Sequence, residues 1–241
     1  DYKNYLIHQV HKYGIKVVLG TAATPEMVED RYDAVIAAVG AQPVIPGIPG
    51  AKGENVTVAT DAIMHSEKIG KNVVVIGGSY IGCFTAQYLA REGAMSPEEL
   101  FFSMTHHSDT MEHILDRLDH SDRSVVLLEQ GKKIGLGFES GTSWPVLGEL
   151  GRLGVPFLKN TLVTAITASG VDATETKKDG AQVTRHYDAD CVVVASGVHA
   201  DDSLTHALLA AGIDAVSIGN CHQLGKAIQA IQAGTELGLT I

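Results

Sequence analysis

The ten residues VVVIGGSYIG, 73–82, have the residue types and spacing of a phosphate-binding turn. The pattern predicts a buried strand from Val73 to Ile76, then a glycine turn, then a helix over 80–92. In a strand, turn and helix of this kind, free N–H groups at the helix start bind the phosphates of a dinucleotide. The sequence therefore predicts a pyrophosphate site made by Gly77, Gly78, Ser79, Tyr80, Ile81 and Gly82.

Ser79 departs from the glycine fingerprint, which has glycine at this middle position. Gly77 permits the tight turn, and Gly82 lets the helix pack closely on the strand. A serine reduces the clearance for a phosphate, although its hydroxyl can donate to one. The motif alone is weak, so a glycine-rich turn that binds no ligand stays open as the alternative.

The carboxylate that would bind the adenosine ribose is missing from its usual place, about 20 residues after the turn. Residues 94–123 are predicted to be a helical insertion, because SPEE at 96–99 is a helix start and a second short helix fits 109–118. Without the insertion, strand 124–128 follows the first helix directly and ends at Glu129.

Glu129 is therefore the predicted ribose ligand, since it lies at the carboxyl end of the second strand of the unit. A carboxylate accepts hydrogen bonds from ribose hydroxyls and repels a 2′-phosphate. We expect NADH to be preferred over NADPH, and the nearby Lys132 and Lys133 to weaken that preference.

Strands and helices alternate along the chain, which predicts an α/β fold with a parallel sheet. Three alternating polar and apolar runs predict a small antiparallel meander at 161–168, 170–176 and 181–187. The other predicted helices are 3–13, 143–152, 203–210 and 224–240, and the other strands are 15–19, 33–39, 155–158, 190–195 and 214–218. Residues 24–32 are expected to form a polar turn, and 41–50 a linker.

Composition limits the classes of partner. The net charge of −10 argues against binding to nucleic acid or to an anionic membrane surface, and no apolar run is long enough to span a membrane. Cys83, Cys191 and Cys221 form no CxxC pair, so we expect neither a metal site nor a redox dithiol. A reducing cytoplasm suits three free thiols. His106, His107 and His186 are expected to be solvated loop histidines.

Four motifs in order resemble the carboxyl-terminal part of the flavoenzyme family that includes 2,4-dienoyl-CoA reductase, enoate reductase and trimethylamine dehydrogenase. They are YDAVIAAVGAQPVIPGIPG (32–50), VVVIGGSYIG (73–82), DADCVVVASGV (188–198) and IDAVSIGNCHQLGKAIQAIQAG (213–234). That family joins a barrel like that of old yellow enzyme to two nucleotide-binding domains of the glutathione-reductase type. The resemblance implies a partial FAD-binding domain, 1–50 with 199–241, and an inserted NAD(P)-binding domain, 51–198.

The resemblance also implies an activity. Hydride would pass from NADH to FAD, for reduction of an unsaturated enoate or enoyl-CoA-like substrate at a barrel that this chain lacks. FMN and a 4Fe–4S cluster are expected only in that missing part. The barrel and the FAD half-domain are expected to be partners within the same chain, and a homo-oligomer is compatible with the resemblance. Residues expected to line the flavin and nucleotide sites are Gly40, Gly197, Gly219 and Asn220. No residue of this part is expected to act as a catalytic acid, base or nucleophile, and the part alone is expected to be inactive.

Three departures from the family leave a second hypothesis open. The FAD glycine fingerprint is absent, Phe84 stands where an acid follows the NAD turn, and Asn220 stands where an aspartate holds the flavin. A nucleotide-binding or structural module without catalysis, in which the dinucleotide site has degenerated, fits these departures as well.

Overall fold

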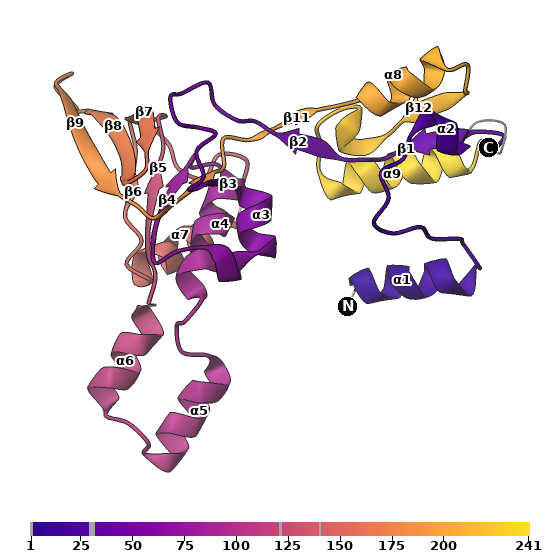
Figure 1. The fold of residues 1–241 in the computed structure, drawn as a ribbon. Helices are drawn as coiled ribbons and strands as arrows, with labels where there is room; N and C mark the ends of the chain where they lie inside the picture. The colour runs from indigo at the N-terminus through magenta and orange to yellow at the C-terminus, as the bar shows by residue number, and fades with distance from the viewer. Residues whose placement is uncertain (1, 29–31, 121, 140) are drawn as a thin grey trace. The chain divides into compact units, whose positions relative to one another are not determined.

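The computed structural model describes residues 2–28, 32–120, 122–139 and 141–241 (Figure 1). The chain forms two compact units, Asp1–Ala41 with Ala200–Ile241, and Gln42–His199. It passes between them twice, through the paired strands β2 (Ala41–Pro43) and β11 (Val198–Ala200). Each unit is described in turn, beginning with the larger.

A five-stranded parallel sheet forms the centre of the larger unit, in the order β3-β10-β4-β5-β6. Its strands are β3 (Val56–Val58), β4 (Asn72–Ile76), β5 (Ser124–Leu128), β6 (Phe157–Leu158) and β10 (Cys191–Val194). The strands predicted at 73–76, 124–128 and 190–195 are confirmed. The predicted α/β fold, with a parallel sheet and a small antiparallel meander, is confirmed.

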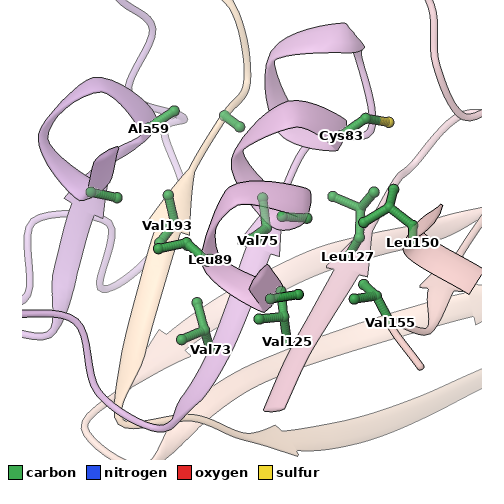
Figure 2. Close-up of a cluster of buried hydrophobic side chains, with 14 of the residues drawn as sticks. Ala59, Val73, Val75, Cys83, Leu89, Val125, Leu127, Leu150, Val155 and Val193 are labelled. Carbon is green, nitrogen blue, oxygen red and sulfur yellow. The ribbon is translucent and has the colours of Figure 1, made fainter. Parts of the chain in front are cut away.

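Both faces of this sheet are covered, which explains its continuous apolar strands. Val73 and Val75 face a cluster that contains Leu89 of α4 and Leu150 of α7 (Figure 2). Val74 and Ile76 face the opposite cluster, which the antiparallel meander supplies. The covering elements are α3 (Ala59–Met64), the 3-10 turn η1 (Ser66–Lys68), α4 (Tyr80–Arg91), α7 (Ser143–Arg152), β7 (Thr161–Thr167), β8 (Gly170–Thr176) and β9 (Gln182–Asp188).

The region 94–123 contains the two predicted helices, α5 (Pro97–His106) and α6 (Met111–Asp119). The predicted helix start at 96–99 is a capping box, because Glu99 N–H donates to Ser96 Oγ at 3.1 Å and Ser96 N–H donates to Glu99 Oε2 at 2.8 Å. The two helices form a hairpin that protrudes from the α/β layers (Figure 1). Its ends meet, since a Cβ placed on Gly93 would lie 3.6 Å from the Asp122 nitrogen.

Arg123, the last residue of that region, belongs to the α/β layers. Its guanidinium donates to the carbonyl oxygens of Gly70 at 2.9 Å and Leu89 at 3.3 Å, and it pairs with the Glu92 carboxylate. Ser66 also donates to Glu92, at 2.5 Å. This network joins the end of α4 to the segments that enter β4 and β5.

The smaller unit contains a two-stranded parallel sheet, β1 (Val35–Ala37) with β12 (Ala215–Ser217). These strands confirm shorter forms of the predicted strands 33–39 and 214–218. Its other elements are α1 (Tyr2–Lys12), α2 (Pro25–Val28), α8 (Ser203–Ala210), the 3-10 turn η2 (Gly219–Cys221) and α9 (Ala227–Gly238). The expected polar turn at 24–32 contains α2, and its residues 29–31 lie outside the described residues.

The strand predicted at 15–19 is wrong, because this apolar segment pairs with no strand among the described residues. Its side chains Ile15, Val17, Val18 and Leu19 are all exposed. The segment 41–50, predicted to be a linker, contains the strand β2. The strand β3 and the helix α3 were not predicted.

Few side chains of the smaller unit are buried. Among its described residues these are Ala37, Thr205, Leu208 and Cys221. Ile36 and Val39 are exposed, so the covering of both faces expected for 33–39 is not present within the described chain. Parallel sheets are normally covered on both faces, and two strands alone are only marginally stable.

We expect the Glu92 network to stabilise the fold in a pH-dependent way. Burial raises the pKa of Glu92, but the hydrogen bonds from Ser66 and Arg123 outweigh it and the pKa is lowered. A carboxylate with a lowered pKa in the folded state contributes stability above its unfolded pKa, about 4.3, and loses it as the pH falls further. Thermal unfolding of Glu92→Gln and the parent chain should therefore differ at pH 7 and converge below about pH 4. Glu67→Gln is the control, because Glu67 is exposed, and a gap that stays constant with pH would contradict the assignment.

Candidate functional site

A cavity of about 380 Å³ lies at the carboxyl ends of the sheet strands in the larger unit. Ligand sites of open α/β sheets form at this edge, where neighbouring connections diverge. Four of the predicted site residues line it, namely Gly77, Ser79, Glu129 and Gly197, together with Gln130 and Ser196. Apolar side chains from 44–48 and 162–163 complete the walls.

The glycine turn brings the start of α4 directly over the end of β4. Gly77 has φ +109°, and a Cβ here would lie 2.5 Å from the carbonyl oxygen of Ala195. A Cβ on Gly82 would overlap the carbonyl oxygen of Gly77. Both positions therefore require glycine for packing between strand and helix, before any ligand is considered.

Several polar groups at the start of α4 have no protein partner. Tyr80 N–H donates to the carbonyl oxygen of Leu136 at 2.9 Å, but the N–H groups of Ile81 and Gly82 have no acceptor in the described part of the chain. The Ser79 hydroxyl is buried and also without a partner there. An unsatisfied buried polar group costs about 1–3 kcal/mol. A hydroxyl and two N–H groups that lack acceptors, at the positive end of a helix, fit an anionic ligand such as a pyrophosphate.

Glu129 follows β5, as predicted, and its carboxylate contacts the glycine turn. Oε2 accepts from Gly78 N–H at 2.6 Å, and Oε1 accepts from Gly131 N–H at 2.6 Å. Each carboxylate oxygen has a second acceptor site, so ribose hydroxyls could still bind. The contact between Glu129 and Gly78 was not predicted, because it depends on how the loop after β5 folds back.

An aromatic cluster replaces the acid that the resemblance led us to expect at Phe84. The ring of Phe138 lies 5.2 Å from that of Phe84 and 6.5 Å from that of Tyr80, edge-on to both. This side of α4 is therefore apolar beside the glycine turn.

The cysteines are buried free thiols. Burial raises the pKa of Cys83 to about 11; a backbone hydrogen bond from Gly135 lowers it, and the charge of Glu129 raises it again. Burial also raises the pKa of Cys191. Both are protonated at neutral pH and unsuited to nucleophilic chemistry. No cluster of metal-ligating side chains occurs among the described residues.

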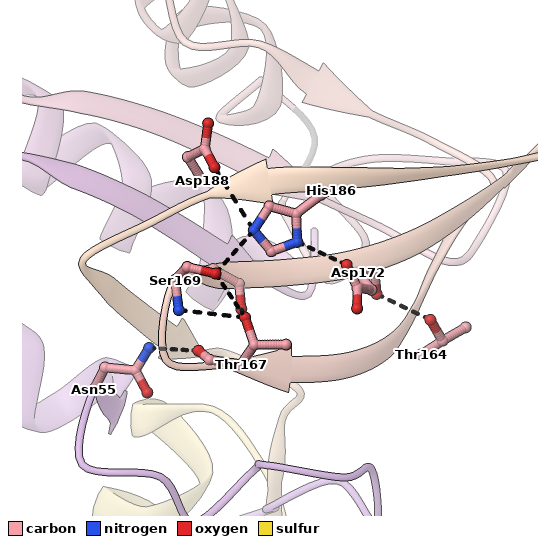
Figure 3. Close-up of polar contacts among 8 residues, drawn as sticks. Asn55, Thr164, Thr167, Ser169, Asp172, His186 and Asp188 are labelled. Atoms are coloured by element: carbon pink, nitrogen blue, oxygen red, sulfur yellow. Dashed lines mark hydrogen bonds and ion pairs between the residues drawn. The ribbon is translucent and has the colours of Figure 1, made fainter.

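His186 lies on β9, so its expected place in a loop is wrong. Nδ1 is 2.7 Å from Asp172 Oδ1 across the β8–β9 pair, and Nε2 is 3.4 Å from Ser169 Oγ and 3.6 Å from Asp188 Oδ1 (Figure 3). The hydrogen bond to Asp172 raises the pKa of His186. Asp172 and Asp188 lie beside the two ring nitrogens on this exposed part of the meander, and we interpret the network as structural. His106 and His107, at the end of α5, are exposed.

The remaining residues expected at the flavin and nucleotide sites fall into two groups. Gly197 lies in the larger unit, and Gly40, Gly219 and Asn220 lie in the smaller one. Gly219 and Asn220 line a cavity of about 250 Å³ beside the start of α9. Asn220 Oδ1 accepts from Gly225 N–H at 2.9 Å and so closes its own loop.

Comparison with known proteins gives a consistent result. A family model described as pyridine nucleotide-disulphide oxidoreductase matches residues 3–218. A metal reductase of Desulforamulus reducens is 31% identical over 211 residues, which cover 86% of this chain and 31% of that protein. An NADH oxidase of Thermoanaerobacter brockii is 29% identical over 246 residues, which cover 100% of this chain and 33% of that protein.

A solved structure of 2-naphthoyl-CoA reductase with 2-naphthoyl-CoA has a TM-score of 0.78 at 29% identity. The match covers 98% of this chain and 31% of that one. The chain thus spans about a third of the length of these relatives. No helix in the described ranges is long and apolar enough to cross a membrane.

We expect Gly82→Ala to destabilise the fold by about 1–3 kcal/mol, because the added methyl group overlaps the Gly77 carbonyl. The matched control is Gly148→Ala in α7, where a Cβ meets nothing within 4 Å. There alanine should stabilise the helix by up to about 1 kcal/mol. Urea unfolding of both variants measures the difference, and equal stabilities would show that the helix does not approach the strand this closely.

Proposed function

Because this chain belongs to the pyridine nucleotide-disulphide oxidoreductase family, a family of flavin- and pyridine-nucleotide-dependent enzymes, we propose that its larger unit binds NADH. The observation that carries the proposal is the cavity where Gly77, Ser79 and Glu129 meet at the carboxyl ends of the strands. The buried Ser79 hydroxyl and the N–H groups of Ile81 and Gly82 would hold the pyrophosphate. When bound, NADH supplies a hydride.

Glu129 would select the nucleotide by charge. Its oxygens can accept from both hydroxyls of the adenosine ribose, whereas a 2′-phosphate would bring like charges together. Lys132 and Lys133 follow within four residues and reduce this repulsion. In this role the protein binds and orients the cofactor, and no protein acid or base is needed here.

The smaller unit would form one side of an FAD site, with Gly40, Gly219 and Asn220 at its edge. Its few buried side chains and its two-stranded parallel sheet support completion by further strands of the same protein. The remaining FAD half-domain would supply these strands. A barrel with FMN and a 4Fe–4S cluster would complete the enzyme, which would reduce an enoate or acyl-CoA-like substrate. The similarity to a 2-naphthoyl-CoA reductase supports this substrate class. The free thiols suit a reducing cytoplasm. A homo-oligomer is compatible with the proposed enzyme.

A non-catalytic module is the second candidate function. Two observations favour it: an aromatic cluster replaces the acid after the turn, and Asn220 Oδ1 is engaged in its own loop. Nucleotide titration separates an intact dinucleotide site from a degenerate one, because a degenerate site would bind neither NADH nor NADPH.

In isothermal titration we expect the chain to bind NADH roughly tenfold more tightly than NADPH, the factor that ~1.4 kcal/mol gives. Glu129→Ala should narrow this ratio, since it removes the charge that opposes the 2′-phosphate. Lys132→Ala should widen it. Equal affinities of the parent chain for the two nucleotides would refute the role of Glu129 in selection.

Ser79→Ala is expected to have opposite effects on binding and stability. Loss of one hydrogen bond, worth about 1 kcal/mol, should weaken NADH about fivefold. The free variant should melt at an equal or higher temperature than the parent, because a buried hydroxyl without a partner is gone. Ser79→Thr, which keeps a hydroxyl, is the companion variant. Unchanged NADH affinity in Ser79→Ala would place the phosphates elsewhere.

A further inference from the structure

Both backbone polar groups of Gly78 form hydrogen bonds. Its N–H donates to Glu129 Oε2 at 2.6 Å, and its carbonyl oxygen accepts from Gly135 N–H at 2.6 Å. The other Glu129 oxygen accepts from Gly131 N–H. One carboxylate thus joins the glycine turn to the segment 131–136 that folds back over it.

The packing of Glu129 and Ile134 explains why position 78 is glycine. A Cβ on Gly78 would lie 2.8 Å from Glu129 Cβ and 2.7 Å from Ile134 Cδ1. The absent side chain makes room for the glutamate, and so serves the protein itself rather than a ligand.

We propose that Glu129 is a positioning residue for the glycine turn, in addition to any contact with a ribose. Its charge-assisted hydrogen bond from Gly78 N–H fixes the turn, and the one from Gly131 N–H fixes the carboxylate itself. Together they orient the Ser79 hydroxyl and the amides of Ile81 and Gly82 before a nucleotide binds. This inference rests on the proposed function for the identity of the ligand, but the geometry of the turn is independent of it. It follows that Glu129 contributes to the binding of phosphate groups even in ligands that have no ribose hydroxyls.

A ligand pair separates positioning from direct contact. ADP and 2′,3′-dideoxy-ADP differ only in the ribose hydroxyls that Glu129 could accept from. We expect Glu129→Ala to weaken both ligands by about tenfold or more, the effect of losing charge-assisted hydrogen bonds. If Glu129 acts only on the ribose, the variant and the parent chain will bind dideoxy-ADP equally, and the proposal fails.

Amide hydrogen exchange tests the same point without ligand. In ¹⁵N-labelled protein, the Gly78 and Gly131 amides should exchange faster in Glu129→Ala, and to a smaller extent in Glu129→Gln, which keeps the volume and one acceptor. Glu112→Ala on α6 removes one carboxylate elsewhere and should leave both amides unchanged. Unaltered exchange of Gly78 in both Glu129 variants would overturn the proposal, whether or not the chain binds nucleotides.

Gly78→Ala provides an independent variant. Its methyl group cannot coexist with the present Glu129 side chain, so it should reproduce the loss of dideoxy-ADP binding. The double variant Gly78→Ala/Glu129→Ala should lose less than the sum of the single losses, because both act on one contact. Additive losses would contradict the coupling. If the parent chain binds neither ADP nor NADH, the proposed function fails, and amide exchange alone decides the positioning role.

Discussion

The close approach of α4 to the end of β4 is the constraint on which the site depends. Gly82 packs against the Gly77 carbonyl, and Gly77 against that of Ala195, with no room for a side chain at either contact. This approach places the start of α4 beside the edge where β4, β5 and β10 end. The apolar strands below, buried on both faces, keep that edge rigid.

Much of the larger unit could be predicted from the sequence because its strands are buried on both faces. Residues 73–76, 125–128 and 191–195 are continuously apolar for this reason. Residues 15–19 are apolar except for Lys16, and the strand predicted there from composition was wrong. A strand requires a neighbour to pair with as well as a suitable composition, and none is present among the described residues. Strand β3, with only three residues, gave too short a pattern to detect.

The site was predictable as a set of residues, but not as a set of contacts. Position along the chain indicated Glu129 once the helical insertion was set aside. Its bonds to Gly78 and Gly131 depend on a loop whose glycines permit many paths, so no local pattern encodes them. The departure at Phe84 was visible in the sequence, whereas its partner Phe138, 54 positions later, could only be found in three dimensions.

The α5–α6 hairpin leaves and rejoins the chain at nearly one point, Gly93 beside Asp122. Arg123 fixes the return at the layer of helices and strands. A branch with joined ends adds little loop-closure entropy when its length changes, because that entropy grows only with the logarithm of length. The hairpin therefore marks an insertion site that tolerates changes of length. Folded elements of quite different size can be exchanged there while β4 and β5 keep their register and the nucleotide turn keeps its shape.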